Sequence, residues 1–545
     1  MGSYAASLRA VAKVFGNPRV RSLQLAGAGS TLGTYAYAVA LPIYAYHSGG
    51  ARTVGLVFFA RFVFAALAAP WLGVLADRWS RRQLMLGGDL VRCAIFAGMT
   101  AAASAGGSPY IVYVLAVTST VVSSSYSPAQ AALLPSLVNT PDELTAANLV
   151  GNTISSVGMF AGPALGGILL AFSTPAAVFA LNGAVFLWSA FFVVQIPRDE
   201  PPRQAERSKL WHELTAGWKT VRRTPALRVV IGLTTGDAIV YGALEVLLVV
   251  LALRILHSGN AGYGWLNTAM GVGSVAGAFV VAAIAARRRL AGGFGLGILL
   301  SGVGLCGAAA LSILAPALFL LGLVGAATIL VEVTSVTLLQ RSAENDVLGR
   351  VFALYETLAL AGTAVGAVVA PALVSGLGPR GALIATGAAL PILLVPLWPT
   401  LHRIDAEARI AEEPLELLRR IDIFAQLPEP VLERLAAGAT AVSAAADQVV
   451  VSRGEAGNHF YVIAAGRASV ELDDGATREL GPGEFFGEIA LLRDVPRTAT
   501  VRAVEPLRLY AVERDDFIAA VTGHAPTLAA AESVVVSRMP VGALG

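Results

Sequence analysis

The first four hundred residues of this chain consist of apolar stretches of about twenty residues, separated by short polar breaks. A helix of about 20 residues is about 30 Å long, which matches the hydrocarbon core of a bilayer. In lipid every backbone N–H and C=O must be paired within the protein, so such stretches form helices rather than open sheets. The pattern therefore predicts an all-α bundle that spans a membrane.

About twelve spans can be delimited in this part of the chain. They lie near residues 20–46, 53–75, 83–104, 109–128, 149–172, 175–196, 227–254, 261–286, 292–314, 316–340, 349–375 and 380–399. The composition agrees, because 56% of all residues are hydrophobic and 14% are charged, whereas soluble domains carry about 25% charged residues. The spans form two six-helix halves, 1–196 and 227–400, joined by a polar loop at 197–226.

Basic residues gather in the breaks on one side of the predicted bundle and are scarce on the other. The rich side holds Arg78, Arg81, Arg82, the stretch 198–228, residues 287–289, Arg341 and Arg350, and the poor side has little beyond Arg52, Arg254 and Arg380. Loops rich in Lys and Arg stay in the cytoplasm, so both termini are predicted to be cytoplasmic. Abundant arginine with only three lysines, and heavy use of Ala and Gly, favours a GC-rich bacterial genome and hence a bacterial plasma (inner) membrane.

The two halves share one short pattern. Residues 158–165 read Gly-Met-Phe-Ala-Gly-Pro-Ala-Leu, and residues 366–373 read Gly-Ala-Val-Val-Ala-Pro-Ala-Leu. An internal repeat in a frame of two six-span halves is typical of major facilitator transporters.

The loop between the second and third predicted spans resembles a signature of that superfamily. Residues 73–82 read Gly-Val-Leu-Ala-Asp-Arg-Trp-Ser-Arg-Arg, and the matching residues are Gly73, Asp77, Arg78, Arg81 and Arg82. The resemblance implies a gating role between the halves, where Asp77 can pair with basic groups and the arginines can cap helix carbonyls or meet anionic lipid. Ser80 stands where the superfamily usually has glycine, so the turn is expected to differ.

The fifth span is similar to that of drug/proton antiporters. Residues 158–167 carry Gly162 and Pro163 in a glycine-rich frame; glycines allow close helix approach, and the proline kinks the span. The related antiporters commonly have an arginine in the fourth helix, but residues 110–127 contain none. Proton coupling by the usual arrangement is therefore not expected.

Three other segments, 127–135, 147–148 and 349–352, resemble the macrolide- and siderophore-efflux branch of the superfamily. The whole resemblance covers roughly residues 15–400. It implies a secondary exporter whose substrate is an amphipathic, drug-like or siderophore-like small molecule.

Of the charged residues inside predicted spans, Asp89, Arg92 and Glu356 lie closer to the cytoplasmic side, and four others are singled out: Arg61, Asp237, Glu245 and Glu332. Charges in hydrocarbon are costly and usually face a cavity or a partner, so each is a candidate for substrate binding or ion coupling. In the resembled fold the seventh and tenth helices line the central cavity, which implies that the three carboxylates face the substrate. A fixed ion pair, such as Arg61 with one of the carboxylates, is the alternative interpretation.

A polar segment near the C-terminus reads Phe-Phe-Gly-Glu-Ile-Ala-Leu-Leu at 485–492, and Arg497 follows it. Gly487 has no side chain, so the backbone can approach a ligand closely. The next residues can form a short helix whose free N–H groups point at an anion. Arg497 can add a charge-assisted hydrogen bond. The pattern therefore predicts a site for a phosphate group.

This run resembles the phosphate-binding cassette of cyclic-nucleotide-binding domains. The resemblance covers 415–525, after a linker at 401–414 and before a C-terminal helix or tail at 526–545. It implies a cytoplasmic β-barrel or jelly-roll domain with flanking helices, in which Glu488 binds the ribose 2′-hydroxyl and Thr498 contacts the phosphate. The other predicted pocket residues are Val470, Phe486, Gly487, Ile489, Ala490 and Arg497. Thr498 is compatible with cAMP and cGMP, and cAMP is favoured for a bacterial chain.

Together the two parts predict a cyclic-nucleotide-regulated secondary exporter, coupled to protons or another ion, with the small-molecule substrate, the nucleotide and the bilayer as its partners. A lipid or lysolipid flippase of the same fold is one alternative, and a membrane-tethered nucleotide receptor without transport is another. No hydrolase triad, metal cluster or ATP-binding loop is apparent, so no enzyme is expected. No basic patch with interleaved aromatic residues indicates a nucleic-acid partner.

Overall fold

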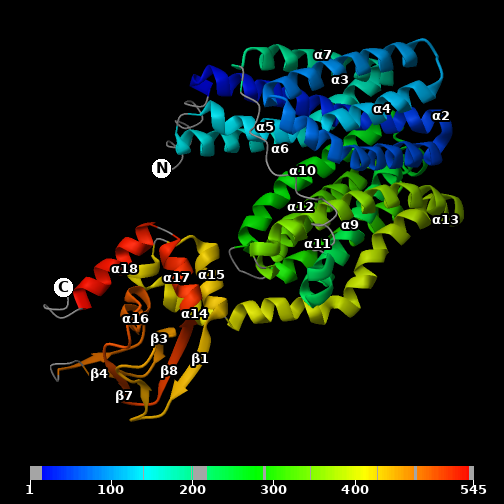
Figure 1. The fold of residues 1–545 in the computed structure, drawn as a ribbon. Coiled ribbons are helices and arrows are strands. Elements are labelled where there is room, and N and C mark those ends of the chain that lie inside the picture. Colours follow the sequence, from blue (N-terminus) through cyan, green and yellow to red (C-terminus); the bar gives the residue numbers. More distant parts are fainter. Residues whose placement is uncertain are drawn as a thin grey trace. The chain divides into compact units, whose positions relative to one another are not determined.

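The computed structural model describes residues 15–138, 140–197, 199, 218–285, 290–343, 345–410, 412–425, 427–471, 476–523 and 525–538. The chain divides into two compact units, which we call the membrane unit, Met1–His402, and the C-terminal unit, Arg403–Gly545. Figure 1 shows that the first is helical and that the strands belong to the second. Each unit is described by itself.

The membrane unit consists of long apolar helices. They are α2 (Pro18–Arg78), α3 (Arg81–Ser104), α4 (Pro109–Ser123), α5 (Tyr126–Leu137), α6 (Pro141–Phe172), α7 (Pro175–Val194), α9 (Pro225–Val250), η1 (Leu251–Ile255), α10 (Gly259–Ala285), α11 (Leu290–Ala310), α12 (Leu314–Ser342) and α13 (Asn345–Ile410). Within the described residues, ten helical segments are long and apolar enough to cross a membrane. The predicted helical membrane bundle is thereby confirmed.

Two of these helices are interrupted by glycines. Helix α2 has non-helical backbone at Gly49 and Gly50, and α13 has it at Gly378. Gly50 and Gly378 have φ angles of 70° and 73°, which glycine adopts without strain. Both breaks fall between two spans predicted from the sequence. Each of the two helices is more than twice as long as a single span across a bilayer core of about 30 Å. The count of twelve spans stays a prediction.

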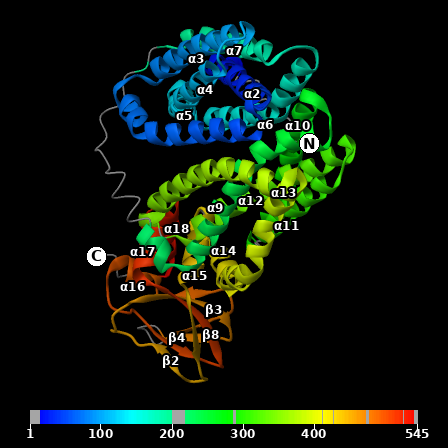
Figure 2. The ribbon, with the colours of Figure 1, turned by 90° about the vertical axis from the view of Figure 1, so that its right-hand side faces the viewer.

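Glycines of the repeated pattern allow equivalent helices of the two halves to pack closely. In the first half, a side chain at Gly162 on α6 would collide with Tyr35 on α2. In the second half, a side chain at Gly366 on α13 would collide with the backbone of Ile239 on α9. Small residues allow such close helix contact in a membrane. Figure 2 shows the halves, blue to cyan and green to yellow, which pack on each other through α6 and α10.

The C-terminal unit holds two four-stranded antiparallel sheets with strand orders β1-β8-β3-β6 and β2-β7-β4-β5. Their strands are β1 (Thr440–Ala444), β2 (Val449–Val451), β3 (His459–Ala465), β4 (Ala468–Glu471), β5 (Thr477–Leu480), β6 (Phe485–Phe486), β7 (Thr500–Ala503) and β8 (Leu507–Glu513). The helices are α14 (Glu412–Arg419), η2 (Asp422–Phe424), α15 (Glu429–Gly438), α16 (Glu488–Arg493), α17 (Arg514–Thr522) and α18 (Ala525–Arg538). This is the predicted jelly-roll domain with flanking helices.

Two apolar clusters stabilise this unit. Side chains from both sheets, among them Ile463, Val501 and Leu509, form a cluster between the sheets. A second cluster joins the helices to β3, where the rings of Phe460 and Phe517 stack with centroids 4.8 Å apart. The cassette is therefore supported from both sides by packed core.

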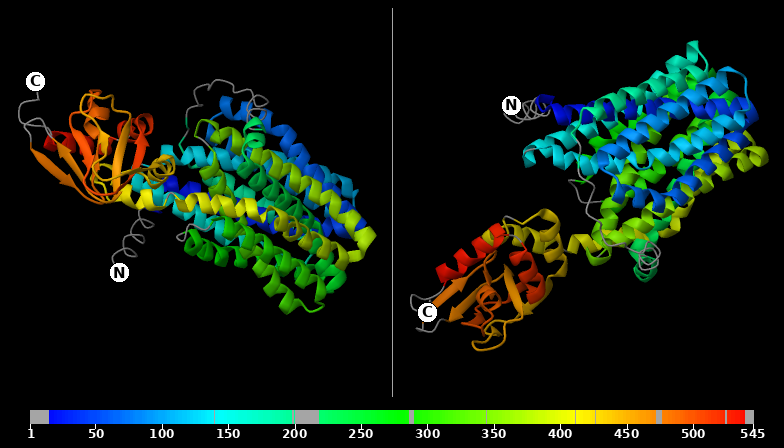
Figure 3. Two further views of the ribbon diagram at one scale, coloured as in Figure 1. Left: turned by 90° about the horizontal axis from the view of Figure 1, so that it is seen from below. Right: turned by 45° about the horizontal axis from the view of Figure 1, so that its top comes forward.

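The predicted linker at 401–414 is mostly helical. Helix α13 continues without a break from Gly378 to Ile410, as Figure 3 shows in yellow, and α14 begins at Glu412. Leu415 and Leu418 of α14 are buried in the core of the C-terminal unit, on the apolar face that the sequence indicates.

Candidate functional site

The cassette begins with a sharp turn at Gly487, which precedes α16. Gly487 has a φ of 96°, in the left-handed region that favours glycine. A Cβ atom there would lie 2.5 Å from Nη1 of Arg497 and 3.0 Å from the carbonyl oxygen of His459. Both the backbone angle and the lack of space therefore require glycine at this position.

Arg497 is held against this turn by its side chain and its main chain. Nη1 donates to the Gly487 carbonyl at 3.0 Å, and Nη2 donates to the His459 carbonyl at 2.6 Å. The Arg497 N–H donates to the Glu455 carbonyl at 2.8 Å. A guanidinium has five N–H donors, and two of them are paired within the described part of the chain, which leaves three for a ligand. The cation is thus fixed at the turn by main-chain carbonyl groups.

The charge of Arg497 lies in a desolvated position. The residue is 6% exposed. Burial lowers the pKa of its guanidinium, while Tyr461, Glu488 and Glu455 act in the opposite direction. An arginine pKa starts so high that the group stays charged at physiological pH. A buried cation of this kind is stabilised by an anion that hydrogen-bonds to it.

The structure brings most other predicted pocket residues to the same region. Glu488 is 2% exposed in the first turn of α16, followed by half-buried Ile489 and buried Ala490. Thr498 is exposed directly after Arg497.

Phe486 and Val470 belong to the apolar cluster between the sheets. The Phe486 ring stacks on Tyr461 with centroids 5.0 Å apart. The guanidinium carbon of Arg497 lies 5.8 Å from the centre of the same Tyr461 ring. Tyr461 therefore connects the apolar wall to the cation.

Sequence reasoning missed three contributors to this site. Tyr461 supplies the ring, His459 supplies a carbonyl, and Gly457 leaves room: a Cβ there would lie 2.7 Å from Cβ of Ala490. The glycine-containing segment at 454–458 could have indicated that the chain needs a small residue at Gly457.

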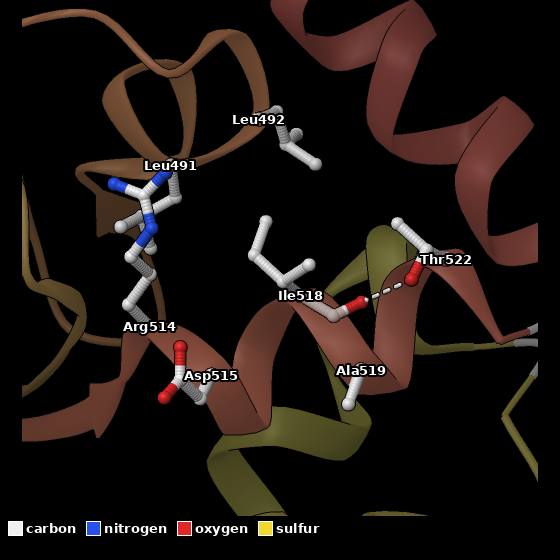
Figure 4. Close-up of a pocket in the computed structure, with 7 residues that line it drawn as sticks. All are labelled: Leu491, Leu492, Arg514, Asp515, Ile518, Ala519 and Thr522. Atoms are coloured by element: carbon white, nitrogen blue, oxygen red, sulfur yellow. Dashed lines mark hydrogen bonds between the residues drawn. The ribbon is translucent and has the colours of Figure 1, made fainter.

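A pocket of about 460 Å³ lies between the cassette helix and α17 (Figure 4). Leu492 of α16 and Ile518 of α17 point into it from opposite sides. Arg514, the first residue of α17, donates to Asp494 at 2.5 Å, and its N–H donates to the Asn458 carbonyl at 2.9 Å. Helix α17 is therefore tied directly to the end of α16 and to the loop before β3.

In the membrane unit, Arg61 on α2 hydrogen-bonds to the fourth helix rather than to a carboxylate. Its Nε donates to Thr120 Oγ1 at 2.8 Å, and its guanidinium carbon lies 5.1 Å from the ring centre of Phe58. Glu245 on α9 lies within electrostatic range of Tyr241, one turn earlier, and of Arg61. Among the described residues these two charges form no direct ion pair, so neither is locked by the other.

The other predicted carboxylates, Asp237 and Glu332, lie within electrostatic range of each other. Asp237 on α9 and Glu332 on α12 interact electrostatically, and Glu332 also interacts with Glu356 on α13. Tyr35 on α2, in the first half, lies within electrostatic range of Glu332. Glu332 and Glu356 are exposed, and Asp237 is half-buried. The arrangement joins acidic groups of the second half to an aromatic residue of the first.

A different charged pair is fully buried inside the first half. Arg92 Nη2 lies 2.6 Å from Asp89 Oδ1, and the two side chains are 2% and 0% exposed. Ser189 donates to the other oxygen of Asp89 at 2.6 Å. The Arg92 guanidinium carbon lies 4.2 Å from the ring centre of Phe186. These groups satisfy one another's charges and hydrogen bonds, as in a fixed structural ion pair.

The predicted gating loop is capped in an unexpected way. Ser80 accepts a hydrogen bond from the Gln83 N–H, and the N–H groups of Arg81 and Arg82 donate to the carboxylate of Asp199 at 2.8 and 3.1 Å. A negative charge is favourable at a helix N-terminus. Arg82 also donates from its side chain to carbonyls at the end of α7. For residues 69–78 the structure describes the backbone alone, so the gating roles of Gly73, Asp77 and Arg78 stay predictions.

The two halves touch at the helix ends where basic residues are scarce. His47 hydrogen-bonds to Asn260 at 2.8 Å, and Arg254 Nε donates to Tyr46 Oη at 2.9 Å. Nearby, a Cβ at Gly167 would lie 3.0 Å from Cα of Gly264. These contacts close the bundle at that end.

Two family models match the chain. Residues 13–420 match the family described as transmembrane secretion effector, and residues 441–524 match the cyclic nucleotide-binding domain. The first match covers well over half of the chain and confirms a multi-pass membrane transporter.

Individual relatives match one part or the other. A cAMP-dependent protein kinase regulatory subunit of Yarrowia lipolytica is 34% identical over 102 residues, which is 18% of this chain and 27% of that protein. A Bacillus subtilis protein named as a bacilysin exporter is 26% identical over 299 residues, 53% of this chain and 71% of that protein. A solved structure of the regulatory domain of Toxoplasma gondii PKA with cAMP is 32% identical, with a TM-score of 0.19, and covers 20% of this chain and 44% of that one. The chain therefore spans about a quarter of the kinase regulatory subunit that it resembles.

The helical bundle, the glycine repeat and the cassette geometry agree with both family matches. The chain belongs to the transmembrane secretion effector family of major facilitator transporters and carries a C-terminal cyclic nucleotide-binding domain.

Proposed function

We propose that this protein is a secondary exporter of an amphipathic small molecule and that a cyclic nucleotide regulates its transport rate. The proposal of regulation by a nucleotide rests on the buried Arg497. Its cation is held at the Gly487 turn, and three of its five N–H donors have no partner among the described residues. The domain that presents it is joined to a transporter of an efflux family.

The cyclic phosphate is the ligand group that this site suits. Arg497 binds a phosphate oxygen through its remaining donors, and the exposed Thr498 hydroxyl donates to a second oxygen. Glu488 accepts from the ribose 2′-hydroxyl. Tyr461 and Phe486 form the adjoining aromatic wall. We favour cAMP over cGMP as the physiological ligand.

Regulation requires that nucleotide binding changes the position of a helix outside the nucleotide pocket. Leu491 is buried in the same cluster as Phe517, and Leu492 and Ile518 pack against that cluster. When a phosphate binds to Arg497 and to the N-terminal N–H groups of α16 together, α16 moves against α17. A ligand shifts a conformational equilibrium only if it binds one of the two conformations more tightly than the other. The displacement of α16 must therefore accompany a change in the conformation of the transporter.

The acidic cluster of the membrane unit supports ion-coupled or proton-coupled export. Neighbouring carboxylates repel each other when both are ionised. A proton or a cationic group of the substrate at Asp237 or Glu332 relieves this repulsion, so occupancy of the cluster can differ between the two open states of the transporter. We propose Asp237, Glu245 and Glu332 as the coupling residues, with Arg61 facing Glu245.

Transport is tested with the full chain in proteoliposomes loaded with ethidium, a fluorescent amphipathic cation, under an imposed pH gradient. Gradient-dependent efflux that is lost in Asp237→Asn supports an exporter. Movement of a fluorescent phospholipid between leaflets without dye efflux identifies a flippase instead. Nucleotide binding with neither activity identifies a tethered receptor.

A further inference from the structure

A second pocket, of about 470 Å³, lies at one end of the second half. Its polar lining consists of Arg254, His257, Ser312 and Arg380, and its apolar lining includes Leu377 and Pro379. These residues come from three places: η1 and the connection after it, the connection between α11 and α12, and the break in α13. The pocket thus brings three segments that are distant in the sequence together at one place.

The backbone that forms this pocket departs from regular structure on two sides. η1 is a π-helical turn at Leu251–Ile255, and π-turns inside α-helices are frequent at functional sites. His257 has a positive φ of 48°, which is uncommon for a residue other than glycine, and Gly378 has a φ of 73°. These local features place Arg254 and Arg380 at one cavity.

Neither arginine has a carboxylate partner among the described residues. Arg254 Nε donates to the Tyr46 hydroxyl at 2.9 Å, and Arg380 Nη2 donates to Ser312 Oγ at 2.7 Å. Both partners are neutral. Each hydrogen bond fixes one edge of a guanidinium and leaves most of its five donors unused. Two fixed cations at one cavity therefore form a site of net positive charge.

The neighbouring surface is apolar and accessible. Leu377 is 57% exposed, and Ile313, next to Ser312, is 66% exposed. Arginine forks bind phosphate oxygens with two parallel hydrogen bonds, so two of them at one cavity suit a phosphate group. Exposed aliphatic side chains beside the cations suit an acyl chain rather than water. We propose that this pocket binds the phosphate group of an anionic phospholipid.

The test uses the full-length protein, purified in detergent, with thermal unfolding followed as phosphatidylglycerol, phosphatidylcholine or inorganic phosphate is added. Phosphatidylglycerol should raise the melting temperature at concentrations at least tenfold lower than phosphatidylcholine does. The double variant Arg254→Gln with Arg380→Gln should lose this preference. Arg52→Gln is the matched control, because Arg52 is exposed near the break of α2 and does not line the pocket.

Three results overturn the proposal. The first is an unchanged lipid preference in the double variant, and the second is an equal loss in Arg52→Gln. The third is stabilisation by inorganic phosphate alone as strong as that by phosphatidylglycerol, which would identify a site for a free anion. If the double variant does not fold, each single variant should show part of the loss, and single variants with the full lipid preference also contradict the proposal.

Discussion

Replacing Arg497 by alanine removes the cation on which the proposed nucleotide site depends. The side chain has three unused donors, and the new residue offers none to a phosphate. A hydrogen bond to a charged group contributes about 1.5–3 kcal/mol. Since about 1.4 kcal/mol corresponds to a factor of ten in affinity, the dissociation constant for cAMP should rise by about ten-fold to more than a hundred-fold.

The same substitution should also loosen the cassette. It leaves the carbonyl groups of Gly487 and His459 without the donors that they have in the structure. An unsatisfied buried polar group costs about 1–3 kcal/mol, so the C-terminal unit should melt at a lower temperature. Arg497→Lys keeps the charge but not the two-pronged geometry, and its affinity should fall between the wild type and alanine.

Isothermal titration of the full-length protein with cAMP and cGMP measures these changes. Arg467→Ala is the matched control, because Arg467 is exposed and makes only surface ion pairs with Glu479 and Glu505. Such pairs contribute little, so this variant should bind nucleotide normally. Unchanged affinity in a folded Arg497→Ala variant would refute the assignment of the pocket.

Other substitutions test separate parts of the account. Gly487→Ala places a Cβ 2.5 Å from the arginine at a positive φ, and calorimetry should show an affinity loss of about ten-fold from about 1–2 kcal/mol of strain. Asp237→Asn should abolish pH-driven dye efflux in proteoliposomes, while Glu332→Gln weakens it; normal efflux in both would make the cluster structural. Burial and the hydrogen bond to Glu413 raise the pKa of Tyr510, so this tyrosine stabilises the fold below about pH 10 and loses that contribution as pH rises through its folded-state pKa. Melting curves should therefore show a smaller loss of stability above pH 10 in Tyr510→Phe than in the wild type.

The glycine substitution has its own control. Gly481→Ala changes the same residue type in the loop before β6, where a Cβ meets no neighbour and φ is not positive. This variant should bind cAMP as the wild type does, and a comparable loss would show that the effect at Gly487 is not specific to the cassette.

The sequence allowed the fold and the glycine turn before α16 to be predicted because each depends on residue type. Twenty-residue apolar stretches leave few alternatives to membrane helices, and a glycine before a short helix marks a turn that only glycine tolerates. The breaks at Gly50 and Gly378 fall where the predicted spans end. These features are local in the chain, so a pattern can reveal them.

Contacts between distant segments could not be predicted in this way. The His459 carbonyl that fixes Arg497 belongs to the backbone, and every residue has such a carbonyl. Asp199 caps the helix that begins at Arg81 from a loop more than a hundred residues away. Glu356 joins the acidic cluster only because α13 packs beside α12. Such pairings arise from tertiary packing rather than from spacing.

The central claim is that nucleotide occupancy changes transport. The most direct measurement is dye efflux from proteoliposomes with and without saturating cAMP on the face of the C-terminal unit, for the wild type and for Arg497→Ala. A coupling free energy of about 1–3 kcal/mol predicts that cAMP changes the wild-type rate several-fold and leaves the variant rate unchanged. Equal wild-type rates with and without cAMP, under conditions where calorimetry shows that the nucleotide is bound, would contradict the account.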